Sequence, residues 1–183
     1  MKKGPAPGAE RRVLMVRYLP FLIALIAVAL VGILYVRSKS SEHGPEFAEL
    51  SAEDTARLEQ QRSVVADAAR HRYGTPRLTR TTADLPIIQK LIDDKVFAES
   101  QTYELQCLGV ALGDVLVSEL PLRWVMITDE YGTDPTLRFK DTSWNVNALT
   151  MISKRIERGE AVSVSQLLNI TREHLNKLEK EYR

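Results

Sequence analysis

An uninterrupted apolar run near the N-terminus limits the architectures open to this 183-residue chain. Residues 18–36 (YLPFLIALIAVALVGILYV) contain no charged side chain. As a helix rising about 1.5 Å per residue, the run would be roughly 28 Å long, close to the hydrocarbon core of a bilayer. Tyr18 and Tyr35 lie at its two ends, where tyrosine rings favour the headgroup level. We therefore expect a single transmembrane helix over residues 18–36.

Two other structures are open to the same run. A buried core helix is disfavoured, because core helices rarely contain so long an apolar stretch between charged flanks. A cleaved signal peptide would also begin with basic residues, but its apolar region is usually about 7–15 residues long. The small-x-small triplet that follows, residues 38–40, contains a lysine and is a poor cleavage site. An uncleaved anchor is therefore our preferred interpretation, with a signal peptide as the alternative.

The charges on either side of the run predict its direction. Residues 1–17 contain five Lys and Arg and one Glu, which is a net charge of +4. Directly after the run come only Arg37 and Lys39, and residues 37–183 carry a net charge of −3. Loops rich in Lys and Arg stay in the cytoplasm. We expect a single-pass protein of the bacterial inner membrane, with residues 1–17 as a cytoplasmic basic tail and the C-terminal part on the extracytoplasmic, periplasmic side.

The remainder divides into a short linker and one domain. Residues 37–50 are polar and contain a Gly-Pro pair, which is typical of a linker. Residues 51–183 are long enough for a single soluble domain. Helical spacing and capping signals predict helices over about residues 51–72, from residue 84, over residues 100–119, up to residue 159 and from residue 163. The expected N-terminal caps are Ser51 with Asp54, Asp84, and Ser163 with Gln166, and the expected helix stops are Gly74 and Gly159. In the last helix Leu168, Leu175 and Leu178 recur at helical spacing.

Between these helices the pattern changes to strands. Residues 123–130 (RWVMITDE) alternate as a strand does, and residues 131–135 form a cluster of turn residues. Leu137 and Phe139 alternate with basic residues as a second strand, and residues 144–146 suggest a short third one. The predicted fold class is α+β: a helical domain with a small three-strand antiparallel meander, behind a transmembrane helix.

Four ordered blocks of this domain are similar to a known family. They are LGVALGD (residues 108–114), WVMITDEYG (124–132), LRFKDTS (137–143) and LTMISKRIERGE (149–160). On these blocks the chain resembles the bacterial family catalogued as domain of unknown function 3806, over about residues 87–160. The resemblance implies a bacterial origin and carries no established activity.

The sharpest candidate for a binding site is the acidic turn, which we define as Asp129, Glu130 and Tyr131. Two carboxylates, a phenol and the following Gly132 at a strand end could bind a cation or a basic partner loop. The competing interpretation is a plain hairpin turn with solvated acids. Adjacent strand residues point to opposite faces, so these carboxylates are poorly placed as an acid–base pair.

A second candidate is the basic group, which we define as Lys154, Arg155 and Arg158. These side chains crowd one predicted helix and could hold the acidic turn in place, or bind an anion or an acidic partner. The competing interpretation is structural ion pairing, although exposed ion pairs contribute only about 0–1 kcal/mol each to folding stability.

Other features point to packing rather than chemistry. Gly109 and Gly113 within a predicted helix indicate close approach of another segment, and Asp114 in an apolar context requires a hydrogen-bonding or charged partner if it is buried. The single cysteine, Cys107, excludes an intramolecular disulfide and a cysteine-based zinc site. We expect no cofactor and no metal, and a net acidic domain without a basic stripe argues against nucleic-acid binding.

These observations favour a membrane-anchored binding or interaction module in the cell envelope, with a protein partner on the meander and its acidic turn. An enzyme is the less favoured hypothesis: a hydrolase that uses Asp129 or Glu130 with Tyr131 or Arg155, which would need a pocket where these side chains converge. A third hypothesis is an immunity-type protein that inhibits a toxin.

Overall fold

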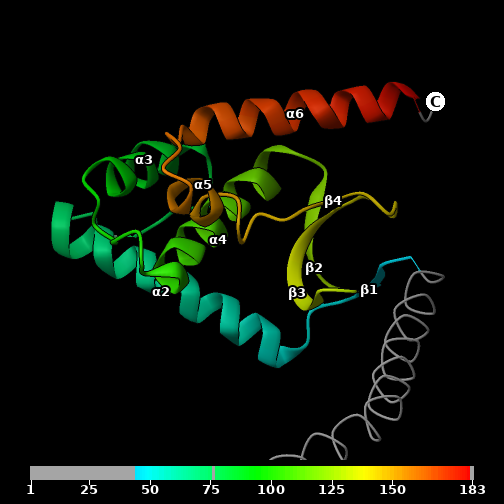
Figure 1. Cartoon of the computed structure of the whole chain (residues 1–183), viewed down its shortest axis with the longest axis horizontal. Coiled ribbons are helices and arrows are strands. Elements are labelled where there is room, and N and C mark those ends of the chain that lie inside the picture. The colour runs from blue at the N-terminus through cyan, green and yellow to red at the C-terminus, as the bar shows by residue number, and fades with distance from the viewer. Residues whose placement is uncertain (1–43, 76, 182–183) are drawn as a thin grey trace, which may run out of the picture. The chain divides into compact units, whose positions relative to one another are not determined.

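The computed structural model describes residues 44–75 and 77–181. Figure 1 shows a mixed arrangement of helices and one antiparallel sheet. The elements in chain order are β1 (Glu46–Ala48), α2 (Ala52–Tyr73), the 3₁₀ turn η1 (Thr82–Asp84), α3 (Leu85–Asp93), α4 (Thr102–Glu119), β2 (Leu122–Asp129), β3 (Gly132–Phe139), β4 (Asn145–Val146), α5 (Ser153–Glu157) and α6 (Val164–Glu181).

The predicted transmembrane helix over residues 18–36 and the basic tail over residues 1–17 lie outside the described residues. Within the part that is described, no helix combines the length and the apolarity that crossing a membrane requires. Of the segment predicted as a linker, residues 37–50, the structure describes residues 44–50, and Glu46–Ala48 form strand β1.

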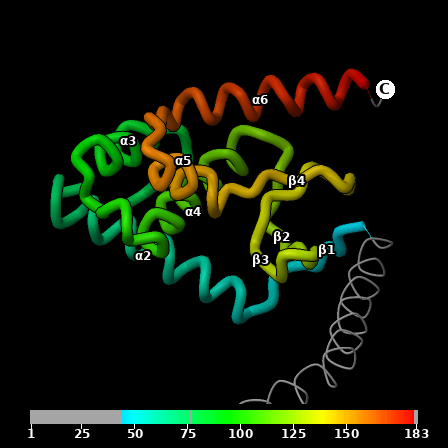
Figure 2. The backbone as a smooth tube through the Cα atoms, viewed as in Figure 1, coloured from blue at the N-terminus to red at the C-terminus, as the bar shows by residue number. Residues whose placement is uncertain are grey.

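The sheet has four strands in the order β1-β2-β3-β4, which corrects the predicted three. Strand β1 pairs antiparallel with β2, with Phe47 opposite Ile127. The extra strand was missed because three residues are too few for an alternating pattern to stand out. The ring of Phe47 also packs against the guanidinium of Arg138, whose Cζ is 4.4 Å from the ring centroid, so a side-chain contact links β1 to β3. Figure 2 shows β1 reaching the sheet from the N-terminal end of the described chain.

The hairpin between β2 and β3 is tighter than predicted. Its register runs from Leu122 opposite Phe139 to Asp129 opposite Gly132, so only two residues form the turn. The predicted turn over residues 131–135 is therefore wrong, since most of it belongs to β3. Pro135 is accommodated because β4 pairs only with Leu137 and Arg138, which leaves β3 without a neighbour on that side at the proline.

Local capping sets the ends of α2 as predicted. Ser51 and Asp54 form a reciprocal capping box: the Ser51 hydroxyl accepts from the Asp54 amide at 3.1 Å, and the Asp54 carboxylate accepts from the Ser51 amide at 3.1 Å. Gly74 ends the helix in the left-handed region at φ 69°. These interactions use only neighbouring residues, which explains why the sequence predicts them.

Two predicted caps differ in the structure. Asp84 precedes α3, but its side chain makes no hydrogen bond to the amides of that helix. Its carboxylate instead accepts the backbone amide of Arg80, in the segment before α3. At the start of α6, the Gln166 amide donates to the Ser163 hydroxyl at 3.4 Å, which is one half of the predicted capping box. The helix predicted to end at Gly159 is confirmed as the short α5, with Gly159 at φ 70°.

Helix α4 is the centre of the domain. Its residues are buried around the full circumference from Cys107 to Leu116, as expected of a helix covered on every side. Helix α2 packs along it, and Figure 1 shows α2 and α6 on opposite sides of α4 in this view. The predicted close approach at Gly109 and Gly113 is confirmed: a Cβ on Gly109 would lie 2.5 Å from the carbonyl oxygens of residues 148 and 149. A Cβ on Gly113 would lie 2.4 Å from the Trp124 indole.

Candidate functional site

The acidic turn lies at the exposed tip of the β2–β3 hairpin. Asp129 ends β2, Glu130 and Tyr131 form the turn, and all three are exposed. The Asp129 carboxylate accepts the backbone amide of Tyr131 at 2.8 Å, which stabilises the turn locally. The Tyr131 side chain is 87% exposed, the highest value among the large hydrophobic residues of the described chain. The turn therefore presents an aromatic ring beside two carboxylates on a projecting hairpin.

The basic group lies elsewhere in the domain. Lys154 and Arg155 are in α5, and Arg158 follows its last residue. Arg155 donates to the carbonyl of Met151 at 2.6 Å, and Arg158 lies 3.9 Å from Glu160. In the described residues, no ion pair joins the basic group to the acidic turn. The hypothesis that the basic group holds that turn in place stays a prediction.

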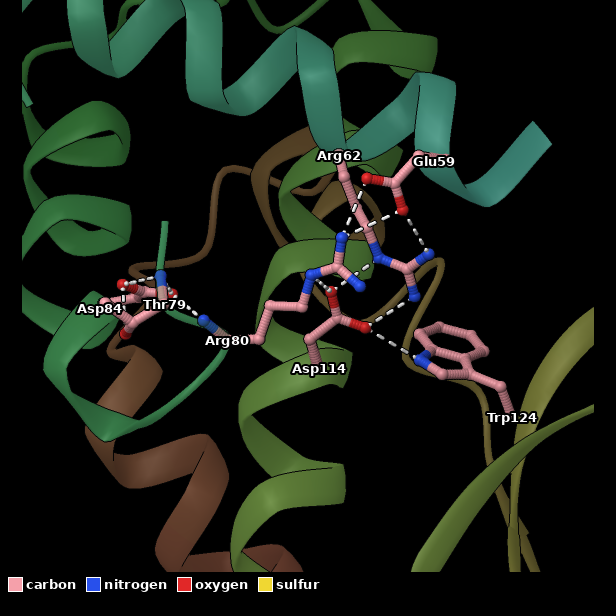
Figure 3. Close-up of polar contacts among 7 residues, drawn as sticks. All are labelled: Glu59, Arg62, Thr79, Arg80, Asp84, Asp114 and Trp124. Atoms are coloured by element: carbon pink, nitrogen blue, oxygen red, sulfur yellow. Dashed lines mark hydrogen bonds and ion pairs between the residues drawn. The ribbon is translucent and has the colours of Figure 1, made fainter. Parts of the chain in front are cut away.

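A different charged cluster, which the sequence did not single out as a site, joins three elements. We define the buried junction as Arg62 on α2, Asp114 on α4 and Trp124 on β2 (Figure 3). The Arg62 Nε and Nη2 atoms each donate to Asp114 at 2.7 Å, a bidentate pair. The Trp124 Nε1 atom donates to the same carboxylate at 3.0 Å. The side chain of Asp114 is 7% exposed and that of Arg62 is 14% exposed.

The electrostatics of the buried junction follow from this geometry. Burial by itself would lower the pKa of the Arg62 guanidinium, but the hydrogen bonds and the charge of Asp114 outweigh it and raise the pKa. The sequence-based requirement that a buried Asp114 find a partner is thus confirmed. The partner lies 52 residues away in the chain, and no local pattern identifies it.

Next to the buried junction, Asp84 holds a strained segment in place. Its carboxylate is buried and accepts the amides of Thr79 at 2.9 Å and Arg80 at 2.7 Å, together with the Thr79 hydroxyl at 2.9 Å (Figure 3). Arg80 adopts φ 60°, in the left-handed region that non-glycine residues rarely occupy. The carboxylate therefore fixes a backbone conformation that directs the Arg80 side chain toward α2 and α4.

The side chain of Arg80 completes the cluster. Its Nη2 atom donates to both oxygens of Glu59, at 2.8 and 2.9 Å, and its Nε lies 3.9 Å from Asp114. Arg80 is 52% exposed and Glu59 is 58% exposed, so this pair is open to solvent. Arg80 and Glu59 border a cleft of about 260 Å³, which we call the arginine cleft. Its lining is Glu59, Arg62, Ser63, Ala66, Arg77, Leu78, Arg80, Asp84, Ala111 and Asp114.

Two further clefts are more apolar. One of about 370 Å³ lies among α3, α4 and the segment after α5, with Phe97, Leu105 and Ile156 in its lining. The other, about 200 Å³, lies between β4 and α6 beside Trp144 and Ile170. None of the six residues of the acidic turn and the basic group lines any of these three clefts.

The described residues contain no cluster of metal ligands, and the Cys107 thiol is buried. No three His, Cys, Asp or Glu side chains gather as a metal site in the described ranges. The Cys107 thiol is fully buried on α4, and burial raises its pKa to about 11. A thiol in this environment stays protonated at neutral pH, so Cys107 acts as a small core residue.

Residues 84–167 match the model of a family described as "Domain of unknown function (DUF3806)". This match confirms the resemblance inferred from the four sequence blocks and extends it at both ends. The comparison with curated proteins found no match.

The fold is also similar to a crystal structure of a protein from Bacteroides thetaiotaomicron VPI-5482, with a TM-score of 0.66 and 14% sequence identity. That similarity covers 72% of this chain and 48% of the other, so the chain spans about half the length of that protein. At this identity the comparison shows a shared fold.

Proposed function

We propose that this chain, in which residues 84–167 form a domain of unknown function (DUF3806), is a membrane-anchored binding protein of the bacterial cell envelope. In this proposal residues 18–36 span the inner membrane, and the domain that begins near residue 45 faces the periplasm. The acidic turn binds a protein partner that presents basic side chains. The observation that carries the binding role is the 87% exposed ring of Tyr131 beside two carboxylates.

The membrane part of the proposal is supported by the sequence. The uncharged run over residues 18–36 has the length of a bilayer span. Five Lys and Arg precede it, whereas Arg37 and Lys39 follow it. This difference favours a cytoplasmic N-terminus.

The hairpin supports the binding part of the proposal through its geometry. Strands β2 and β3 pair over eight residues each, so the acidic turn projects on an ordered support. Asp134, also exposed, lies opposite Ile127 and adds a third carboxylate near the tip. A tyrosine ring offers a large contact area at little cost in side-chain entropy, and tyrosine is enriched at interface hot spots. The local negative charge favours a basic partner through electrostatic complementarity.

The enzyme hypothesis receives less support from the same residues. It required Asp129 or Glu130 to converge in a pocket with Tyr131 or Arg155. These side chains lie at an exposed turn and on α5, and none of them lines the clefts described above. An open surface of this kind suits recognition better than catalysis, which needs a concave site that excludes water.

The binding role can be tested by site-specific photocrosslinking in cells of the native host. A photoreactive phenylalanine analogue replaces Tyr131 in the full-length protein, and a matched protein carries it at Tyr103, which is 45% exposed on α4. We expect one discrete crosslinked protein from position 131 and none from position 103. In the first protein, adding Glu130→Ala and Asp134→Ala should remove that product. Equal products from both positions, or a product that survives loss of the acids, would contradict the proposal.

The topology is tested separately. Alkaline phosphatase, which is active only outside the cytoplasm, is fused after Arg183 of the full chain and of a variant lacking residues 18–36. We expect activity in the membrane fraction for the full chain and none for the deletion. An inactive fusion of the full chain, with a cytoplasmic reporter active at the same position, would reject the orientation.

A further inference from the structure

We propose that the arginine cleft binds a small molecule or chain end bearing one carboxylate, through Arg77 and Arg80. This site is separate from the acidic turn and does not rest on the function proposed above. None of the comparisons assigns a ligand to it. The inference follows from the ion pairs of the cleft, which leave Arg77 without a partner, from the strained segment at its border and from its size.

The ion pairs of the cleft leave one guanidinium without a carboxylate. Three arginines and three carboxylates line it. Asp84 keeps its charge, but its oxygens accept the amides of Thr79 and Arg80 and the Thr79 hydroxyl, and in the described residues it forms no ion pair with these arginines. Glu59 and Asp114 each form ion pairs with Arg62 and Arg80, whereas Arg77 pairs with neither. A ligand with a single negative charge would give Arg77 a partner.

Two of the three guanidinium groups, those of Arg77 and Arg80, are also accessible to solvent. Arg62 is held by Asp114 in the buried junction, which uses both oxygens of that carboxylate. Arg80 is half exposed and hydrogen-bonds to Glu59 through Nη2. Arg77 is exposed and makes no hydrogen bond or ion pair with the described part of the chain. A guanidinium offers five N–H donors, so Arg77 and Arg80 retain donors for a carboxylate, which a planar fork binds in bidentate fashion.

The strain at Arg80 points to the same cleft. A non-glycine residue at φ 60° is disfavoured, and such strain tends to persist where it serves a site. Here the Asp84 carboxylate holds the segment through its bonds to Thr79 and Arg80. The arrangement keeps the Arg80 side chain at the border of the cleft before any ligand arrives, which lowers the entropic cost of binding.

The volume and the apolar lining of the cleft restrict the size and the polarity of the ligand. Its volume of about 260 Å³ lies just below the range usual for drug-sized ligands. Ala66, Leu78 and Ala111 supply apolar side chains to the lining. A carboxylate on a short apolar body fits both the charge and the lining. A larger or multiply charged anion fits neither.

The test is a titration of the full-length protein in detergent micelles by isothermal calorimetry. The probes are propionate, its uncharged amide propionamide, inorganic phosphate and acetyl-alanyl-alanine. We expect saturable binding of propionate with a Kd on the order of 1 mM, and no binding of propionamide. Tighter binding of acetyl-alanyl-alanine than of propionate would assign the carboxylate to a peptide end. Equal or weaker binding would assign it to a free small acid. Binding of propionamide, or of phosphate as tightly as propionate, would overturn the proposal.

Variants localise the binding. Arg77→Gln and Arg80→Gln should each weaken propionate binding by about tenfold, the usual size for a charge-assisted hydrogen bond. The matched control is Arg70→Gln, which removes a 56% exposed arginine from an ion pair on α2, outside the lining of the cleft, and should leave propionate binding unchanged. Glu59→Gln removes the competing carboxylate and should tighten binding several-fold, a gain that a folding defect cannot produce. Equal losses in Arg70→Gln, or no gain in Glu59→Gln, would overturn the proposal.

Discussion

The buried junction and the acidic turn use the same kinds of side chain in opposite environments. Each brings an aromatic ring of β2 or its turn close to a carboxylate. In the buried junction Asp114 is 7% exposed and accepts three hydrogen bonds from Arg62 and Trp124. In the acidic turn Tyr131 is 87% exposed, and Asp129 accepts one local amide.

Burial, rather than residue type, decides what a carboxylate contributes to the stability of the fold. A buried carboxylate without its partner costs several kcal/mol, so the buried junction matters to stability and to the placement of α2 against α4. An exposed carboxylate is solvated in either state of the chain and adds little to folding. It remains accessible at the surface, which is why we propose a recognition role for the acidic turn.

The largest expected effect comes from breaking the buried junction. Asp114→Ala should lower the free energy of unfolding by about 3 kcal/mol, because the Arg62 guanidinium keeps only the exposed Glu59 as a counter-charge and the Trp124 Nε1 atom loses its acceptor. Urea denaturation of the full-length protein, followed by tryptophan fluorescence, measures the change. The double variant Arg62→Met/Asp114→Leu should recover most of the loss, since two apolar side chains need no partner. A loss in the double variant as large as in the single one would contradict this account.

The next largest effect on stability is expected at Gly109, where α4 packs closely against the backbone of residues 148 and 149. Gly109→Ala should gain about 1 kcal/mol of helix propensity. The new Cβ, however, would lie 2.5 Å from two backbone carbonyl oxygens, which must move. We expect a net destabilisation of about 1–3 kcal/mol in the same denaturation experiment. Gln106→Ala, a partly exposed position on α4, serves as the control and should change stability by less than about 0.5 kcal/mol.

The buried thiol on α4 gives a pH-dependent prediction. Because burial raises the pKa of Cys107 to about 11, the unfolded chain releases this proton at lower pH than the folded chain. Its contribution to stability is complete below about pH 8.5, the ordinary thiol pKa, and is lost as the pH rises toward about 11. The free energy of unfolding should fall over this window, and less steeply in Cys107→Ala. Parallel curves for the two proteins would reject the assignment.

The smallest effect on stability is expected at the acidic turn. Glu130→Ala should change the free energy of unfolding by less than about 0.5 kcal/mol, because the side chain is exposed. A fall of more than 1 kcal/mol would show that the hairpin tip has a structural role, and the comparison with the buried junction would then fail. Thermal unfolding by circular dichroism is sufficient for this measurement.

The sequence predicted those parts of the fold that depend on neighbouring residues. The capping box at Ser51 and the helix stop at Gly74 are local, and both are confirmed. The leucine spacing of α6 is confirmed too, with Leu168, Leu175 and Leu178 buried. Strand β1 and the two-residue turn escaped prediction, because a short strand is stabilised by pairing with distant residues rather than by its own pattern.

For the candidate sites too, the sequence predicted properties of single residues, whereas the contacts between distant residues came only from the tertiary structure. The sequence predicted that Gly109 and Gly113 allow close packing and that a buried Asp114 needs a partner, since both follow from the chemistry of single residues in an apolar helix. Only the tertiary structure paired Asp114 with Arg62, turned Asp84 away from α3 and gathered the arginine cleft from α2, α4 and the segment between α2 and α3. Contacts between residues far apart in the chain depend on how whole elements pack, and no local pattern encodes that packing.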